Sequence, residues 1–135
     1  MKVTIFSILI LLTITGCSTL LPEDELNLTR QRLEHYLMNN VSTQSEMNIL
    51  SSNIVELANM ERYLVEYRIW NQPNYTKIEK SFLTDCEKWE KLADAEAKKP
   101  SQFEGGSMAP CDINLRMVSF IEKRIKELKT KWRKK

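Results

Sequence analysis

Apolar residues recur at intervals of three and four along most of the chain, which is the period of an amphipathic α-helix. The pattern predicts helices over residues 23–38, 44–70, 76–99 and 112–135, of which the second is the longest and clearest. Beyond residue 17, Pro and Gly fall between or just before these stretches. No stretch alternates strictly between apolar and polar residues, as a half-buried strand would. We therefore expect an all-α, largely up-and-down bundle of about four helices.

The second and fourth stretches carry the most regular apolar stripes, and such stripes can pair within one chain or between two chains. A coiled-coil hairpin that dimerises is therefore an alternative to the bundle. The helix starts have their own signals. Thr43 with Glu46 and Thr76 with Glu79 form capping boxes, and Asp112 is the expected N-cap of the last helix.

The first seventeen residues have the pattern of a secretory signal. Lys2 precedes an apolar run over residues 3–12, which is too short for the ~20 residues of a membrane-spanning helix. The chain then reads Ile-Thr-Gly-Cys, and this ending resembles the lipobox of bacterial lipoproteins. The resemblance implies cleavage before Cys17 and attachment of acyl chains such as palmitate to that residue, and two or three chains anchor a protein permanently. The alternative is an uncleaved signal anchor.

This cleavage divides the chain into a signal peptide (1–16), a lipidated tether (17–23) and a single helical domain (24–135). The domain is long enough for one modest core and too short for two. Ser18 stands where lipoproteins retained in the inner membrane carry Asp. The resemblance therefore favours the cell envelope, at the periplasmic face of the outer membrane.

The net charge says little about partners. The chain has 20 basic and 18 acidic side chains, and without Lys2 it has 19 and 18, so no general affinity for nucleic acid is expected. The charge is unevenly placed, because eight of the last thirteen residues are basic. This stretch is either a solvated helix face that suits the helix dipole or a contact for anionic lipid or cell-wall polymer.

Two cysteines remain after Cys17, namely Cys86 and Cys111. A compartment outside the cytoplasm favours oxidation, so we expect one disulfide that closes the bundle and stabilises it by roughly 3–4 kcal/mol. A metal pair or a reactive thiol has no support, because the single histidine, His35, is distant from both in sequence.

No pattern in the sequence points to catalysis, and we expect neither an enzyme nor a cofactor. With one His, no Ser–His–Asp, Cys–His or metal-ligand arrangement can be assembled. Carboxylate pairs such as Asp85 and Glu87 fall on helix faces that look exposed. Tyr63, Tyr67 and Trp70, near the end of the second helix, fit core and rim positions better than a glycan-stacking platform.

Residues 101–110 interrupt the helical pattern with the loop SQFEGGSMAP, whose Gly-Gly pair suits backbone conformations that other residues avoid. With WEKLADAE before it (89–96) and RIKEL after it (124–128), the loop resembles the C-terminal signature of LprI-type bacterial lipoproteins. The positions that carry the resemblance are Trp89, Asp94, Glu96 and Arg124 outside the loop, and Glu104, Gly105, Gly106, Ser107 and Pro110 within it.

The chain departs from that family's pattern at three positions. Ala93 stands where the family carries Arg, Ala97 stands where it carries its first Cys, and in the same register Arg116 occupies the position of its second Cys. The cysteines of this chain lie elsewhere. The loop would have to fold back for Cys86 to reach Cys111.

The resemblance implies a lipid-anchored, non-enzymatic protein that inhibits lysozyme and so protects peptidoglycan. Glu104 and Ser107 are then the expected contacts to the partner, and the two glycines between them allow close backbone approach. The alternative belongs to another class, a pilotin-like assembly chaperone that binds a partner's helix in an apolar groove. An inhibitor would present a polar contact loop, whereas a pilotin-like protein would present a contiguous apolar groove.

Overall fold

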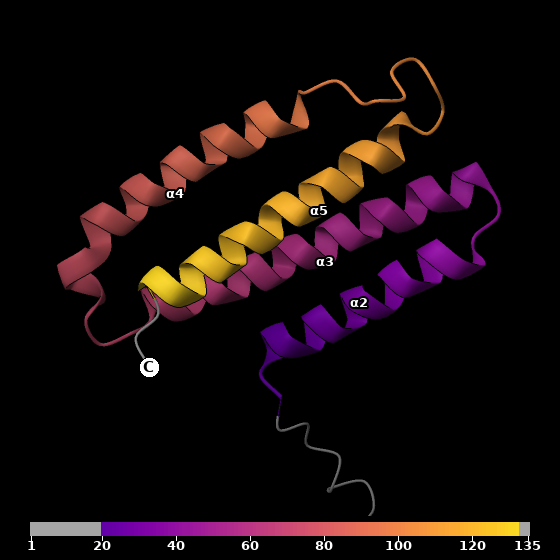
Figure 1. Cartoon of the computed structure of the whole chain (residues 1–135). Helices are drawn as coiled ribbons and strands as arrows, with labels where there is room; N and C mark the ends of the chain where they lie inside the picture. Colours follow the sequence, from indigo (N-terminus) through magenta and orange to yellow (C-terminus); the bar gives the residue numbers. More distant parts are fainter. Residues whose placement is uncertain (1–19, 133–135) are drawn as a thin grey trace, which may run out of the picture.

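The computed structural model describes residues 20–132, which form four α-helices and no strand. These helices are α2 (Pro22–Asn40), α3 (Gln44–Trp70), α4 (Tyr75–Ala97) and α5 (Ala109–Glu127), and a short π-helix, η1 (Leu128–Trp132), continues α5. Consecutive helices run in opposite directions, with α3 and α5 side by side in the middle and α2 and α4 on either side of them (Figure 1). The predicted all-α up-and-down bundle is confirmed.

The predicted signal peptide and Cys17 lie outside the described residues. Within residues 20–132, no helix combines the length and the apolar character that crossing a bilayer requires.

The start of α3 follows the predicted capping pattern. The hydroxyl of Thr43 accepts a hydrogen bond from the backbone N–H of Glu46 (3.4 Å) and donates one to the carboxylate of Glu46 (2.8 Å). One of the first unpaired N–H groups of the helix is thereby satisfied.

The starts of α4 and α5 differ from the prediction. α4 begins at Tyr75 and its N-cap makes no side-chain hydrogen bond, so Thr76 lies inside the first turn. Burial of the Tyr75 ring, in ring contact with Trp70 and Phe82, fixes this start. α5 begins at Ala109 rather than after an Asp112 cap, because Pro110 fits the first helical turn, where its missing N–H needs no partner.

The core consists of two groups of buried apolar side chains. The larger joins α3, α4, α5 and η1, and its members are Ala58, Val65, Ile69, Tyr75, Phe82, Trp89, Ala93, Ile121, Ile125 and Leu128. The smaller joins α2, α3 and α5, with Leu37, Ile54 and Val118. Large aromatic side chains carry much of the packing of α4. Phe82, for example, meets Trp132 of η1 edge to face, with 5.5 Å between ring centres.

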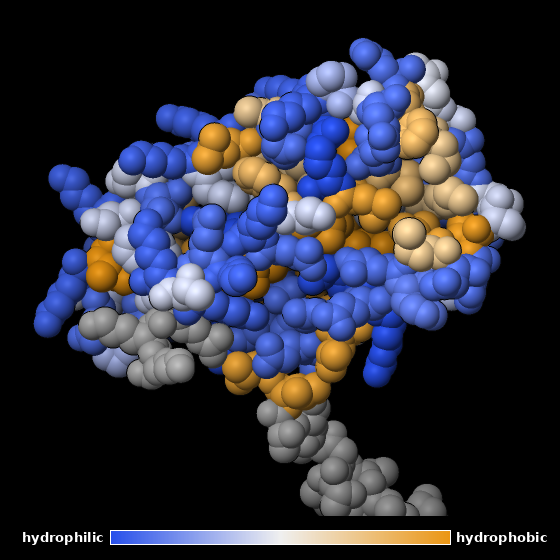
Figure 2. All heavy atoms as spheres, viewed as in Figure 1, coloured by the Kyte–Doolittle hydropathy of each residue, from blue (hydrophilic) through white to orange (hydrophobic). Residues whose placement is uncertain are grey.

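Several charged side chains are buried beside this core. Glu61 and Arg30 are 1% and 2% exposed, and their side chains approach to 3.7 Å between α3 and α2. Arg30 also pairs with Glu122 of α5 at 2.7 Å. The outer surface is largely hydrophilic and is interrupted by separate hydrophobic areas, one of them at the start of α2 (Figure 2).

Candidate functional site

The loop between α4 and α5 is held in place by Asp112, in the first turn of α5. The Asp112 carboxylate accepts hydrogen bonds from the hydroxyl of Ser101 (2.6 Å), the backbone N–H of Gln102 (3.3 Å) and the side-chain amide of Gln102 (3.1 Å). The bond from Ser101 is the main reason why the pKa of Asp112 lies below its ordinary value. The residue predicted to cap the helix instead orders the loop.

The tip of this loop is a tight turn with an acidic residue on it. The backbone N–H of Gly106 donates to the carbonyl of Phe103 (2.8 Å), and Gly105 has a φ of 75°, where a side chain is disfavoured. A Cβ on Gly106 would stand 3.0 Å from the same carbonyl oxygen. Glu104, Gly105 and Gly106 are exposed, and Glu104 has no ion pair with any described residue. The turn therefore presents the Glu104 carboxylate to solvent.

Ser107 fastens the other side of the loop to the start of α3. Its hydroxyl donates to the side-chain oxygen of Gln44, and its carbonyl accepts a hydrogen bond from the amide of Asn48 (3.2 Å). The side chain predicted to contact a partner is thus engaged within the molecule. Of the two expected polar contacts, Glu104 is the one left free at the tip.

Trp89 and Arg124, two of the residues that carry the family resemblance, lie together between α4 and α5. The Trp89 ring is stacked on Phe120 with 5.7 Å between ring centres. The guanidinium groups of Arg62 and Arg124 lie 4.5 Å and 5.7 Å from the centre of the Trp89 ring. Arginine over an indole face is a favourable contact, so this cluster joins α3, α4 and α5.

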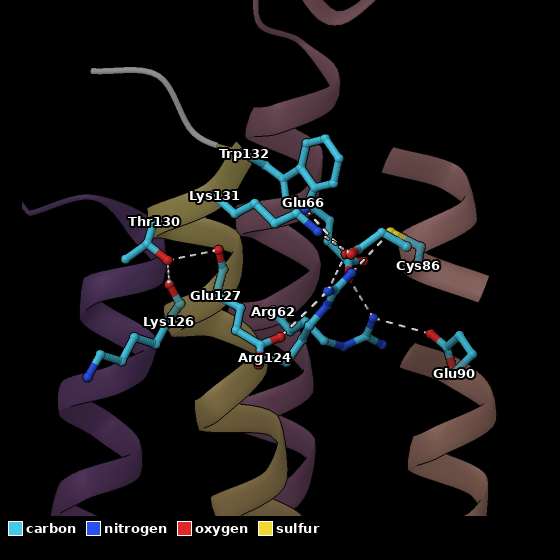
Figure 3. Close-up of polar contacts among 11 residues, drawn as sticks. Arg62, Glu66, Cys86, Glu90, Arg124, Lys126, Glu127, Thr130, Lys131 and Trp132 are labelled. Carbon is cyan, nitrogen blue, oxygen red and sulfur yellow. Dashed lines mark hydrogen bonds and ion pairs between the residues drawn. The ribbon is translucent and has the colours of Figure 1, made fainter. Parts of the chain in front are cut away.

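The side chain of Arg124 is 3% exposed and points, with Lys131, from α5 and η1 toward α4, where Cys86 lies (Figure 3). Its partner is Asp85, at 2.5 Å. The same carboxylate accepts hydrogen bonds from Lys131 (2.7 Å) and from the indole N–H of Trp132 (3.2 Å). Burial acts to raise the pKa of Asp85, but the hydrogen bonds from Lys131 and Arg124 outweigh it and the pKa is lowered.

The other residues of the resemblance lie at the loop end of the bundle. Pro110 is in the first turn of α5, and Asp94 pairs with Lys98 on an exposed part of α4. Glu96 pairs with Lys99 at 2.6 Å and with Arg116 of α5 at 3.3 Å. The structure therefore separates the matched residues into two groups, one around Trp89 and one beside the loop.

Arg116 connects the end of α4 to α5. Its guanidinium donates to the backbone carbonyls of Lys99 (2.8 Å), Pro100 (3.2 Å) and Glu96 (3.3 Å). These carbonyls lie at the end of α4 and just beyond it, where the helix leaves such groups without partners. The sequence analysis considered Arg116 only as a departure from a family pattern and missed this role.

The predicted disulfide between Cys86 and Cys111 is wrong, because both cysteines are free. The Sγ of Cys86 lies 3.5 Å from Arg124, whereas Cys111 lies thirteen residues earlier on α5. Thirteen residues span about 20 Å of helix, far more than the ~2 Å length of a disulfide bond. The antiparallel register of α4 and α5 thus places the two thiols at different levels. Burial raises the pKa of the Cys86 thiol.

Part of the basic C-terminal stretch is engaged within the fold. Arg124 and Lys131 pair with Asp85, and Lys129 lies 3.4 Å from the buried Glu61. This arrangement leaves fewer free charges for an anionic surface than the sequence indicates. Residues 133–135, which hold the last three basic side chains, lie outside the described part.

The three aromatic residues predicted for core and rim lie on the surface of α3. Tyr63, Tyr67 and Trp70 are each more than half exposed, because Val65 and Ile69 take the core-facing positions at this end of the helix. Because these large rings are exposed on α3, they are candidates for contact with another molecule.

Within residues 20–132, no group of three or more His, Cys, Asp or Glu side chains is placed to hold a metal ion. The single histidine, His35, is exposed on α2. The comparisons give no relative to argue from, because no match was found among family models, curated proteins or solved structures.

Proposed function

We propose that this chain is a lipid-anchored binding protein of the cell envelope, similar to LprI-type lipoproteins, and that it inhibits lysozyme through the loop between α4 and α5. The observation that carries the proposal is the Glu104 carboxylate, exposed at the tip of a turn whose two sides are fastened by Asp112 and Ser107. Binding then requires little further ordering of the loop, which lowers the entropic cost of association.

The charge of the tip suits this partner. Common lysozymes are cationic, and an acidic group on a protruding turn can form a charge-assisted hydrogen bond in their substrate cleft. The two glycines after Glu104 allow the partner's surface to approach the backbone closely.

The register of α4 and α5 gives independent support. Ala97 and Arg116 occupy the positions that the LprI-type pattern gives to its two cysteines. In this fold Arg116 bonds the carbonyls of Glu96 and Lys99, which flank Ala97 along the chain. An arginine thus joins the same two segments that a disulfide would join in the family.

The test is the lysis of a peptidoglycan suspension by c-type and g-type lysozymes, with and without the full chain purified from membranes. We expect stoichiometric inhibition at physiological salt. Glu104→Gln removes the charge without changing the size of the side chain, and the loss of one charged hydrogen bond should weaken inhibition roughly ten-fold or more.

Glu87→Gln is the matched control, because Glu87 is an exposed carboxylate on α4 without an ion pair to any described residue. Equal inhibition by Glu104→Gln and Glu87→Gln would refute the role of the loop. An absence of inhibition by the unaltered chain would refute the function itself.

Membrane attachment is a separate part of the proposal. The mass of the chain extracted from the producing cell should show acyl groups on an N-terminal Cys17, and separation of the membranes should place it in the outer one. Cys17→Ala should abolish this acyl mass. An unaltered chain whose mass retains the signal segment and shows no acyl groups would favour a signal anchor instead.

A pilotin-like assembly chaperone is the second candidate, and one observation favours it. A groove of about 350 Å³ lies between α3, α4 and α5, where Tyr63 and Trp89 line it together with the charged Arg62, Glu90 and Asp94, and Met60 is exposed one turn away on α3. A partner's amphipathic helix could pack there. Met60→Ser with Tyr63→Ser should abolish capture of such a partner while leaving lysozyme inhibition unchanged. Retained capture would exclude this groove as its site.

A further inference from the structure

One end of the bundle, which we call the tether end, gathers the start of α2, the end of α3, the start of α4 and η1 (Figure 1). Glu23 of α2 pairs with Arg68 of α3 at 2.8 Å, and the side-chain amide of Gln72 donates to the carbonyl of Trp132 at 3.2 Å. These contacts join α2, α3 and η1, and the stacking of Tyr75 on Trp70 adds the start of α4.

The position of Cys17 keeps this end close to a membrane, if the proposed lipid attachment is correct. Pro22, where α2 begins, is five positions after Cys17 in the chain. A fully extended chain covers at most about 3.6 Å per residue, so the start of α2 lies within about 18 Å of the anchor. The tether end therefore meets the bilayer surface more often than any other part of the domain.

The tether end carries exposed aromatic side chains. Tyr67 and Trp70, here called the interface aromatics, are 64% and 59% exposed. The ring of Trp70 begins a row that continues through Tyr75 and Phe82 to Trp132, with centre-to-centre distances of 5.9, 6.0 and 5.5 Å. Tyr and Trp favour the boundary between lipid and water, because their rings are apolar and carry a polar group.

A pocket of about 470 Å³ lies beside Trp132, the last ring of this row. We call it the basic pocket, and it is lined by Lys80, Ser81, Thr84, Asp85, Lys88, Lys131 and Trp132. Its one carboxylate, Asp85, is already bonded to Arg124 and Lys131. Among the described residues, no carboxylate lies within ion-pair distance of Lys80 or Lys88. The hydroxyl of Thr84 already donates to the carbonyl of Lys80 (2.8 Å), so the pocket combines uncompensated positive charge with the hydroxyl of Ser81 as a donor, a combination that suits a phosphate group.

We propose that the tether end docks on the bilayer that holds the lipid anchor, with the interface aromatics at the headgroup level and an anionic phospholipid phosphate in the basic pocket. The short tether supplies proximity, the interface aromatics supply apolar contact, and the basic pocket selects anionic headgroups. The proposal rests on lipidation at Cys17 and does not depend on lysozyme inhibition.

The first experiment locates the two ends of the bundle relative to the bilayer. The acylated full chain is reconstituted into vesicles of phosphatidylcholine with and without phosphatidylglycerol, with bromine on the acyl chains to quench nearby tryptophan fluorescence. We expect quenching that is stronger with phosphatidylglycerol and that falls about two-fold in Trp70→Phe. Phe103→Trp, which adds a tryptophan at an exposed position of the distant loop, should add unquenched fluorescence.

The second experiment tests the basic pocket. Lys80→Gln with Lys88→Gln should reduce quenching in phosphatidylglycerol vesicles to the level in phosphatidylcholine. The matched control is Lys98→Gln with Lys99→Gln, which removes the same charge at the other end of α4 and should change nothing. Quenching that is equal with and without phosphatidylglycerol, that survives in Trp70→Phe, or that extends to Phe103→Trp would overturn the proposal. If a protein occupies this surface instead of lipid, quenching should be equal with and without phosphatidylglycerol or should survive in Trp70→Phe.

Failure of the lipid anchor has a different signature. If the mass of the chain shows no acyl groups, the proposed attachment is refuted, and the same variants are then sedimented with preformed vesicles. Each lysine near an anionic surface contributes about a five-fold change in binding. Salt-sensitive binding to phosphatidylglycerol vesicles that Lys80→Gln with Lys88→Gln weakens at least that much would still support the docking surface, and an absence of binding would overturn it.

Discussion

Substitution of Asp85 by Asn should destabilise the domain far more than the surface position of this carboxylate indicates. The substitution keeps the size of the side chain, so no cavity forms, but it removes the charge that compensates Arg124. The Arg124 side chain is 3% exposed and is paired with Asp85 at 2.5 Å. Removal of one partner of a buried ion pair costs 3–5 kcal/mol in general.

The lower end of that range applies here. Glu127 lies 3.9 Å from Arg124 and offers partial compensation, and the bond of Asp85 to the exposed Lys131 adds little. We therefore expect a loss of about 3 kcal/mol, a large part of the ~5–15 kcal/mol that stabilises a domain. Urea denaturation followed by circular dichroism measures this free energy of unfolding directly.

The dependence on pH provides a second check. The pKa of Asp85 is lowered in the folded protein, so its contribution to stability is present above its unfolded pKa and is lost as the pH falls through the folded pKa. The difference between the unaltered chain and Asp85→Asn should be complete at pH 7 and should shrink below about pH 4.

The matched control is Asp94→Asn on the same helix, where the pair with Lys98 is largely exposed and should be worth under ~1 kcal/mol. The reasoning is refuted if Asp85→Asn and Asp94→Asn lose equal stability, or if the difference from the unaltered chain is the same at pH 7 and pH 3.

Three further predictions concern other parts of the fold. Burial raises the pKa of Glu61, so its contribution to stability is lost as the pH rises through that pKa. The free energy of unfolding of Glu61→Gln minus that of the unaltered chain, measured by urea denaturation, should therefore increase from pH 4 to pH 7; a decrease would contradict this. Gly105→Ala places a Cβ at a φ of 75° and should cost about 1–2 kcal/mol in the same assay, whereas an unchanged value would show that the turn adopts another conformation. Because Cys86 and Cys111 are free, a reductant should leave the melting temperature unchanged and mass spectrometry after alkylation in urea should find both thiols labelled; a fall in melting temperature would contradict the separation of the two thiols.

The sequence predicted the helices well because their signals are local. The three-and-four spacing and the positions of Pro and Gly identified four helices, and the Thr43 cap identified the first residue of α3. Asp112 failed as a cap because its carboxylate has a competing set of donors in Ser101 and Gln102, and those contacts exist only once the loop is folded.

The disulfide prediction was wrong for a different reason. The apolar pattern places Cys86 on the inner face of α4, but it does not give the offset of α4 along α5. That offset is set by contacts such as Asp85 with Arg124, between residues 39 positions apart. Glu61 and Arg62 did have a local signal, because both fall at core-facing positions between Ala58 and Val65. A charge within an apolar stripe is the pattern that would have identified them.

The separation of the two ends of the bundle resolves an apparent conflict between its charges. A basic C-terminal stretch should repel a cationic lysozyme, yet the loop that carries Glu104 contacts Gln44 and Asn48 at the start of α3, whereas the basic pocket lies between α4 and η1. Along α4, Lys88 is the pocket residue nearest the loop, and nine positions, or about 14 Å of helix, separate it from the end of α4 at Ala97. Surface charges are largely screened beyond about 8 Å at physiological salt. The same molecule can therefore hold a membrane at one end and offer an acidic turn to a cationic partner at the other, and raising the salt should weaken the two contacts independently.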